Sequence, residues 1–319
     1  MSIHWRQRPE GGGFLALWLI RFIALHGGRP LARLVLYPVT LYFFLRRGYE
    51  RRSSRAFLTR VLGRRAGTRQ VLRHIHSFAS VILDRVFMLA RGEQHFRIEV
   101  EGVEILDAQL REGRGVLLMG SHLGSFEALR LLSRRHSDAR LRVVLDKQQA
   151  PALTALLDAL APDIGAGVID GSQDPASVVL AMGEAARQGH MIGLLADRGH
   201  PGDAMRRVRF LGDPASFPLG PWMLAASLRI PVTLCFGLYL GGNRYKLVFE
   251  AFADPGQLPR KARGEAMEGY VRAYAERLEH QARAYPYNWF NFYDFWHDPT
   301  QVDGTVPDAG HGGGVGASA

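Results

Sequence analysis

His122 and Glu127 are the two residues whose types and spacing most clearly suggest chemistry. They lie in GVLLMGSHLGSFEALR (115–130), where an apolar run ends shortly before the histidine. A carboxylate that accepts a hydrogen bond from one imidazole nitrogen leaves the other nitrogen free to act as a base. Residues five apart on a straight helix point about 140° away from each other, so the pair requires His122 in a turn and Glu127 in the helix that follows. The alternative is a strand, a loop and a helix that carry the two residues by chance.

The surrounding sequence predicts the elements that would position this pair. From residue 115 onward short apolar runs alternate with helical stretches, which is typical of a mainly parallel central sheet flanked by helices. The predicted strands are 115–119, 141–146, 167–170 and 190–197, and the predicted helices are 125–136, 150–161 and 175–188. Sites in such α/β folds form beyond the carboxyl ends of the strands, and His122 follows the first of these strands.

Further elements lie on either side of this alternation. Residues 53–92 are predicted to be helical, with one buried face, and 96–106 alternates apolar and charged residues as a half-exposed strand does. The run IPVTLCFGLYL–GGN–RYKLVFEAF predicts a hairpin over 230–252, followed by a helix over 259–284. The buried helical face is expected to consist of Phe78, Ile82, Val86 and Leu89.

The charge balance points to an anionic partner. Forty Lys and Arg against thirty Asp and Glu give a net charge of +10, which favours nucleic acid, anionic lipid or an acidic carrier protein. The single cysteine, Cys235, excludes an internal disulfide and is expected to be a buried small hydrophobe. No second His or Cys lies at ligand spacing from His122, so the sequence predicts no metal there, and no cofactor is expected.

The N-terminal region is apolar and then strongly basic. Two apolar runs, 14–20 and 31–45, are separated by Arg21 and by glycine and proline, and neither forms a clean spanning helix. Clustered arginines beside apolar helices are attracted to an anionic cytoplasmic leaflet; here they are Arg46, Arg47, Arg51, Arg52 and Arg55. We therefore expect a membrane-anchoring or interfacial helical segment over 1–50, a catalytic domain over 51–300 and a disordered tail over 301–319. A soluble helical cap with solvated arginines is the alternative.

Two blocks of this sequence resemble a known family. GSHLGSFE resembles the His-x4-acid motif of the lysophospholipid acyltransferase superfamily, and its Glu is similar to that of the bacterial lipid A biosynthesis branch, the late lauroyl/myristoyl acyltransferases. LLADRGHPGDAMRRVRFLGDPASFPLGPWMLA (194–225) is similar to a later block of that branch. The resemblance extends over about residues 14–297.

The resemblance implies transfer of an acyl chain from an acyl-carrier-protein thioester, or from coenzyme A, to a lipid hydroxyl. It implies that His122 is the base and that Glu127 holds and polarises it. Asp197 matches the family's later acid, with a helix cap or an ion pair to Arg198 as the alternative role. The residues expected to contact substrate are Ser121, Lys147, Asp197 and Arg198, where Lys147 stands in a block that commonly has arginine.

Several features bear on the partners. FPLG (217–220) has Leu219 where glycerol-phosphate acyltransferases have Glu, which argues against a simple glycerol-phosphate acceptor. Lipid A or its precursor, an amino-acid lipid and a polyketide-like lipid conjugate stay open as acceptors. The triplet Arg206, Arg207 and Arg209 is expected to meet an acidic carrier protein or anionic headgroups, with solvated charge as the alternative. The resemblance places the enzyme at the cytoplasmic face of a bacterial inner membrane.

Two other functions compete with acyl transfer. A non-catalytic peripheral membrane protein would use the basic helices alone, and a nucleic-acid-binding protein would use the +10 charge. The aromatic run YPYNWFNFYDFW (285–296) could stack on bases, but it has no interleaved basic residue. Core packing over the site is the favoured role for that run, with a membrane-interface contact as the alternative, and no nucleic-acid partner is expected.

Overall fold

The central element is a seven-stranded sheet. The computed structural model describes residues 28–128, 140–148, 151–160, 165, 167–199, 202–259 and 263–297. The strands lie in the order β1-β9-β8-β2-β5-β3-β4. Their bounds are β1 Arg97–Glu101, β2 Val116–Gly120, β3 Leu141–Leu145, β4 Ile169–Asp170, β5 Met191–Leu195, β8 Val232–Gly241 and β9 Arg244–Ala253.

Most of the sheet is parallel, as the sequence predicts. β2 pairs in parallel with β5 on one side and with β8 on the other, and β3 continues the parallel order beyond β5. β8 turns back into β9 to give the expected antiparallel hairpin, and β1 runs parallel to β9 at the edge. The carboxyl ends of β2, β5, β3 and β8 therefore meet at one edge of the sheet.

The sheet is buried on both faces, which explains the continuous apolar runs in its strands. Successive residues of β2 enter different clusters: Leu117 and Met119 pack on one side, and Val116 and Leu118 on the other. Cys235 is 2 % exposed and belongs to the second cluster, which confirms its role as a small buried hydrophobe.

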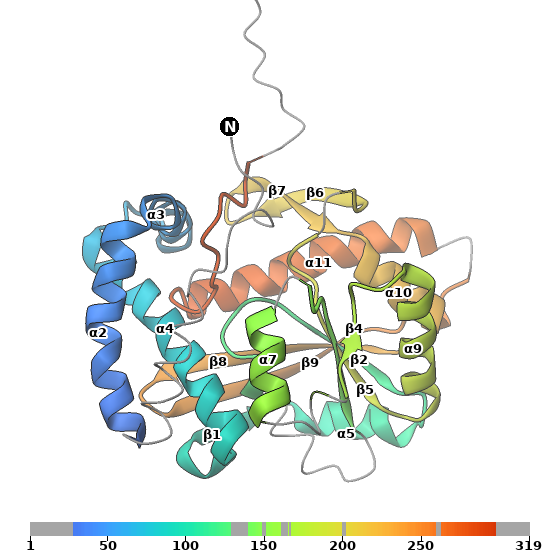
Figure 1. Ribbon diagram of the computed structural model, residues 1–319. Helices are drawn as coiled ribbons and strands as arrows, with labels where there is room; N and C mark the ends of the chain where they lie inside the picture. The colour runs from blue at the N-terminus through green and yellow to red at the C-terminus, as the bar shows by residue number, and fades with distance from the viewer. Residues whose placement is uncertain are drawn as a thin grey trace, which may run out of the picture.

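Helices flank the sheet (Figure 1). The helices are α2 Gly28–Arg46, α3 Gly48–Leu62, α4 Thr68–Arg91, α5 Val103–Arg111, α7 Pro151–Leu160, α9 Pro175–Arg187, α10 Gly220–Leu228 and α11 Arg263–Ala284. Short 3-10 turns occur at Glu93–His95 and Pro255–Gln257. A second, two-stranded sheet, β6 Met205–Phe210 with β7 Asp213–Pro218, packs on α11.

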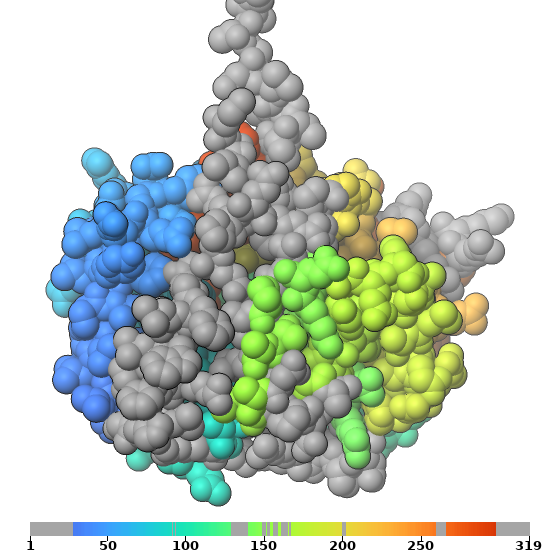
Figure 2. All heavy atoms as spheres, in the orientation of Figure 1, coloured from blue at the N-terminus to red at the C-terminus, as the bar shows by residue number. Residues whose placement is uncertain are grey.

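The N-terminal helices form one flank of the molecule (Figures 1 and 2). Arg29 of α2 makes a two-point ion pair with Asp84 of α4 at 2.8 and 2.9 Å, and Tyr245 of β9 donates to the same fully buried carboxylate. This cluster fixes α2 to α4 and to the β8–β9 hairpin. Within the described residues, no helix is long and apolar enough to cross a membrane.

The outer face of α2 carries an exposed apolar stripe. Six large side chains, each between 51 and 64 % exposed, recur at helical spacing: Leu31, Leu34, Tyr37, Leu41, Tyr42 and Leu45. Arg46 and Arg52 are exposed beyond its end. The apolar run 14–20, Arg21 and the tail 301–319 lie outside the described residues.

Three details differ from the sequence expectations. The strand predicted over 96–106 ends at Glu101, because Gly102 adopts φ 77° and starts α5. Residues 205–218, for which no strand was predicted, form the β6–β7 hairpin. Phe78, expected on the buried face of its helix, is 37 % exposed, whereas Val86 and Leu89 are buried. Of the helix predicted over 125–136, the described part is Glu127 and Ala128, both helical.

Candidate active site

His122 and Asp197 meet at the carboxyl edge of the sheet. His122 follows β2 and Asp197 follows the neighbouring strand β5, so the parallel pairing of the two strands brings them together. Nδ1 of His122 lies 2.8 Å from Oδ1 of Asp197, and the backbone N–H of His122 donates to Oδ2 at 3.1 Å. One carboxylate thus orients both the ring and the backbone of the histidine, although 75 residues separate them.

Trp289 holds the same carboxylate from the other side. Its indole Nε1–H donates to Oδ2 of Asp197 at 3.0 Å, and both side chains are fully buried. The side chain of His122 keeps 36 % of its surface exposed. Nδ1 is occupied by Asp197, and Nε2 is the ring nitrogen that Asp197 does not contact.

The loop that carries His122 is fixed by backbone bonds to two other segments. The amide of Gly124 donates to Asn288 O at 2.8 Å, and the amide of Phe290 donates to His122 O at 2.9 Å. On the β8 side the amide of Ser125 donates to Gly237 O at 2.6 Å. The amides of Gly124 and Ser125 are therefore already hydrogen-bonded to backbone carbonyls, and they are not free to bind an oxyanion.

Close approach explains one glycine of this loop and one glycine of β8. Gly124 has φ 76°, and a Cβ there would lie 1.9 Å from Gly237 O. A Cβ on Gly237 would lie 2.0 Å from Ser125 O. A side chain at either position would push the His122 loop away from β8.

The charges around His122 favour a neutral base. Burial lowers the pKa of His122, the positive charges of Arg198 and Arg85 lower it further, and Asp197 opposes them. Burial acts to raise the pKa of Asp197, but His122, Arg198 and the Trp289 indole outweigh it and hold that pKa below its ordinary value. The carboxylate is therefore ionised and the imidazole unprotonated at neutral pH.

Arg198 closes one side of the site. Its Nη2 donates to Phe290 O at 2.8 Å, and its guanidinium lies over the Tyr293 ring, 5.2 Å from the ring centroid. The side chain thus connects the end of β5 to the C-terminal segment. It does not form the ion pair with Asp197 that was the alternative role for these two residues; the partners of Asp197 are His122 and Trp289.

Glu127 is paired differently from the expectation. Its Oε1 lies 2.9 Å from Nε of Arg85 on α4, and the partner that the structure gives His122 is Asp197. Glu127 lies in the first described turn of its helix, where α4 supplies the cation that a carboxylate only 4 % exposed requires. Its Oε2 is buried and accepts no hydrogen bond from the described part of the chain.

The other residues expected to contact substrate also lie at this edge. Ser121 is buried between β2 and His122. Lys147 follows β3, and its backbone N–H lies 3.4 Å from Oδ1 of Asp170. Both positions follow parallel strands that neighbour β5 in the sheet.

The arginine triplet lies on β6, away from the strand ends. Arg206, Arg207 and Arg209 are exposed, and Arg206 pairs with Glu268 of α11. Arg209 lines a surface depression of about 610 Å³ between β6 and α11, together with Arg272 and Arg283. The triplet therefore belongs to the two-stranded sheet and not to the seven-stranded sheet whose strand ends carry His122 and Asp197.

The aromatic run packs over the site, as the sequence analysis favoured. Trp289 contacts the rings of Phe57, Phe210 and Phe295 at centroid distances of 5.1, 5.2 and 4.9 Å. In Figure 1 this reddish C-terminal segment runs alongside α3 and α4. The half-exposed Phe78 lies edge-on to Phe290, whose amide binds His122 O.

Sequence reasoning missed Trp289 and Arg85 as individual site residues. Trp289 stands in a run of other aromatic residues, so the sequence does not single it out. Its indole N–H is the polar group that allows it to bind Asp197 as well as to pack. Arg85 carried a visible signal, because it is a charged residue between buried neighbours of an otherwise apolar helix face.

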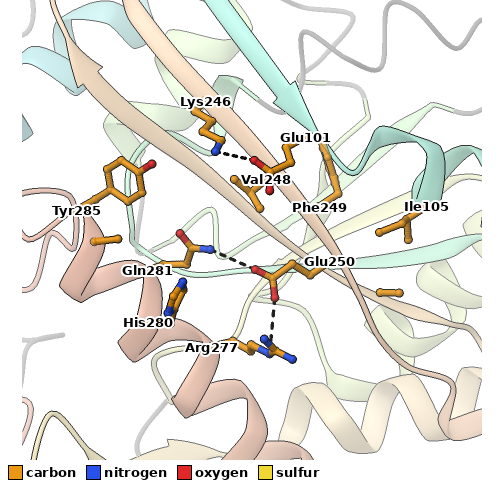
Figure 3. A pocket seen from close by; sticks show the side chains of 12 residues that line it. Glu101, Ile105, Lys246, Val248, Phe249, Glu250, Arg277, His280, Gln281 and Tyr285 are labelled. Carbon is orange, nitrogen blue, oxygen red and sulfur yellow. Dashed lines mark hydrogen bonds and ion pairs between the residues drawn. The ribbon is translucent and has the colours of Figure 1, made fainter.

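Another surface depression, of about 560 Å³, is unrelated to this site. Its lining comes from β1, α5, β9 and α11, and its charged side chains are paired with each other (Figure 3). Lys246 contacts Glu101 at 2.6 Å, and Glu250 contacts Gln281 at 3.2 Å and Arg277 at 3.7 Å. Across the residues that the structure describes, no cluster of three His, Cys, Asp or Glu could hold a metal ion.

The fold and site together define an α/β enzyme with a carboxylate–imidazole pair at the carboxyl edge of a mostly parallel sheet. Residues 4–298 match the model of the bacterial lipid A biosynthesis acyltransferase family, and the chain belongs to that family. No curated protein matches the chain. The family makes the protein an O-acyltransferase of lipid A biosynthesis that transfers an acyl group to a lipid. This result favours catalysis over the scaffold and nucleic-acid alternatives.

Proposed function

We propose that His122 is the general base of the acyl transfer and that Asp197 is the acid that orients it. The observation that carries this proposal is the 2.8 Å contact between Nδ1 and a fully buried carboxylate, which leaves Nε2 on a partly exposed ring. A neutral imidazole held in one tautomer by a carboxylate is the arrangement that general-base catalysis requires.

The proposed reaction has two steps. Nε2 of His122 takes the proton of the acceptor hydroxyl while the hydroxyl oxygen attacks the thioester carbonyl carbon. The tetrahedral oxyanion then collapses, the carbon–sulfur bond breaks, and the leaving thiolate takes the proton back from His122. The positive charge of Arg198, which acts on His122, favours the negative charge that develops.

Glu127 has a different role in this proposal. Its ion pair neutralises Arg85 and ties α4 to the helix that follows the His122 loop. Ser121 and Lys147 provide further polar groups along the same strand ends. The acyl chain is proposed to lie against the aromatic side chains beside His122, of which Phe78 is half-exposed.

The proposed donor is an acyl-carrier-protein thioester. Carrier proteins are acidic, and the chain has a net charge of +10. Arg209 and Arg272 line one depression together with Glu276, while Arg283 of the same depression is paired with Glu279. An acyl-coenzyme A thioester is the alternative donor. Reversing the charge of Arg209 and Arg272 is expected to raise KM for the carrier thioester and leave KM for acyl-coenzyme A nearly unchanged.

The proposed place of action is the cytoplasmic face of a bacterial inner membrane. The apolar stripe of α2, with Arg46 and Arg52 beyond it, matches a helix that lies in the interface of an anionic leaflet. The proposed acceptor is the hydroxyl of lipid A or its precursor, with another glycolipid or an aminolipid as alternatives.

Lipid mass spectrometry on cells that lack the protein tests the proposal. Complementation with the wild-type chain is expected to restore one acyl chain on a lipid, and complementation with His122→Ala is expected to restore none. The mass of the restored lipid identifies the acceptor class. Restoration by both chains would remove His122 from the chemistry.

A further inference from the structure

A buried hydroxyl–imidazole pair lies directly behind the proposed catalytic pair. Oγ of Ser54 on α3 lies 2.8 Å from Nδ1 of His74 on α4, and Nε2 of His74 lies 2.9 Å from the carbonyl oxygen of Trp289. Ser54 and His74 are both fully buried, so neither meets solvent or substrate.

The chemistry of the partners fixes the direction of these hydrogen bonds. A carbonyl oxygen only accepts, so Nε2 of His74 carries the proton and donates it to Trp289 O. Nδ1 of a neutral ring then accepts, and the Ser54 hydroxyl donates to it. Burial lowers the pKa of His74 to about 4, against the weaker effect of the bond to Trp289, and the ring is therefore neutral at physiological pH.

Aromatic rings hold the His74 ring in place. Phe292 stacks on it with a centroid distance of 4.8 Å and Phe290 with 6.1 Å, while Phe57 packs at 5.5 Å. Of these, Phe290 binds the backbone of His122, and Phe57 also packs edge-on against Trp289. The pair therefore has the same neighbours as the proposed catalytic residues.

We infer that Ser54 and His74 are positioning residues, which fix the backbone of Trp289 so that its indole N–H holds Asp197 against His122. The connection begins with Ser54 and His74, 2.8 Å apart, and continues from His74 to the Trp289 carbonyl oxygen at 2.9 Å. The Trp289 indole then contacts Asp197 at 3.0 Å, and Asp197 contacts His122 at 2.8 Å. Within Trp289, the connection passes from the backbone to the side chain. It links α3 and α4 of the N-terminal flank to the end of β5. The inference rests on the proposed function, because it assigns its effect to Asp197.

Two substitutions of similar size separate this role from packing. The amide nitrogen of Gln reaches the position of Nε2, so His74→Gln keeps a donor for Trp289 O, whereas the shorter His74→Asn places its amide near Nδ1. We expect His74→Gln to keep kcat within a few-fold of wild type. We expect His74→Asn to lower kcat roughly 10- to 100-fold with little change in KM, because misplacement by about 1 Å has an effect of that size.

The same helix offers a matched control. Nδ1 of His76 on α4 also contacts a hydroxyl, that of Thr40 at 3.1 Å, but the His76 ring stacks on Tyr37 of α2 and not on the Trp289 segment. His76→Asn is expected to leave kcat within about 2-fold of wild type. Equal losses for His74→Asn and His76→Asn would overturn the inference.

A double-mutant cycle shows whether the effect passes through Asp197. In an Asp197→Asn background, His74→Asn is expected to cost less than about 2-fold, because the carboxylate that it would position is gone. A full 10-fold loss in that background would overturn the inference and leave His74 a packing residue. If Asp197→Asn alone left kcat unchanged, the proposed role of Asp197 would fail instead.

Folding is checked independently of activity. Each variant is compared with wild type by its melting temperature and its near-UV circular dichroism. If His74→Asn does not fold, Ser54→Ala replaces it, and we expect a several-fold loss of kcat that disappears in the Asp197→Asn background. A wild-type kcat for a folded Ser54→Ala chain together with an inactive, folded His74→Gln chain would contradict the connection.

Discussion

The indole N–H of Trp289 donates to Oδ2 of Asp197 at 3.0 Å, while Oδ1 of the same carboxylate binds His122 at 2.8 Å. Asp197 is fully buried, so these contacts compensate for its loss of water. The two donors lie 167 residues apart in the chain and approach the carboxylate from the ends of different elements. The orientation of His122 consequently depends on a residue that contacts no substrate.

Removing the charge of Asp197 is expected to affect catalysis more than removing that of Glu127. Asp197→Asn eliminates the acceptor that fixes the His122 tautomer, so kcat should fall roughly 10²- to 10⁴-fold with KM little changed. Glu127→Gln leaves the His122–Asp197 contact intact and should lower kcat much less than Asp197→Asn does. Steady-state kinetics with both purified variants check this. An inactive Glu127→Gln beside a nearly active Asp197→Asn would restore Glu127 as the partner of the base.

The acid limb of the pH profile should move with the charges around His122. A base must be unprotonated, and burial followed by Arg198 lowers the pKa of His122, so activity should persist below the ordinary histidine pKa of 6.5. Arg198→Met removes one lowering influence, and its acid limb should move to higher pH. Asp197→Asn removes the raising influence, and any residual activity should have an acid limb at lower pH. Profiles of kcat/KM against pH for wild type, Arg198→Met and Asp197→Asn give the pH of each acid limb. If the three acid limbs coincide, His122 is not the titrating base.

His74 should make the protein less stable in acid. Its pKa is about 4 in the folded chain and about 6.5 in the unfolded chain, so below pH 6.5 the unfolded state binds the additional proton. The stabilisation is fully present above pH 6.5 and is lost between pH 6.5 and 4. This difference between the folded and unfolded pKa values of His74 corresponds to about 3 kcal/mol in the free energy of unfolding. Urea unfolding of wild type and His74→Gln at pH 7 and pH 4.5 should show a steeper loss for wild type, and equal losses would place the titration elsewhere.

The apolar stripe of α2 should determine membrane binding. Leu34 and Leu41 are 64 and 52 % exposed, and transferring each Leu side chain into an interface contributes up to about 1.5–3 kcal/mol. Leu34→Glu with Leu41→Glu should therefore weaken binding to anionic vesicles at least about 10-fold. Leu180→Glu is the matched control, because Leu180 is 70 % exposed on α9, far along the chain from α2. Co-sedimentation with anionic vesicles measures the binding of both variants. If Leu180→Glu weakens binding as much as Leu34→Glu with Leu41→Glu does, α2 has no specific role in membrane binding.

Most strands of the seven-stranded sheet could be predicted from the sequence, because a short continuous apolar run in an α/β chain is usually a buried strand. β2, β3, β5 and the β8–β9 hairpin lie within two residues of their predicted bounds. The β6–β7 hairpin was missed because its alternation of Arg and apolar residues is short and interrupted by Pro214. The strand predicted over 96–106 was too long because the φ of 77° at Gly102 is a property of the folded backbone.

The structure brings several of the predicted site residues together, but it pairs His122 with Asp197 and not with Glu127. His122, Asp197 and Arg198 do lie together, since each follows one of two adjacent parallel strands. Spacing along the chain favoured Glu127 as the partner of His122, because local separation is visible in a sequence and strand order is not. Glu127 pairs with Arg85 because α4 packs beside the His122 loop. The position of α4 relative to the sheet cannot be predicted from a local sequence pattern.

The loop around His122 is completed by the final described segment of the chain, through Asn288, Trp289 and Phe290. Translation proceeds from the N-terminus, so the α2 stripe is made long before the indole that secures Asp197. The stripe that is proposed to bind the membrane is therefore available on the nascent chain before Trp289, which holds Asp197 against the proposed base. Chains that terminate before residue 289 would carry the stripe without the indole that fixes Asp197.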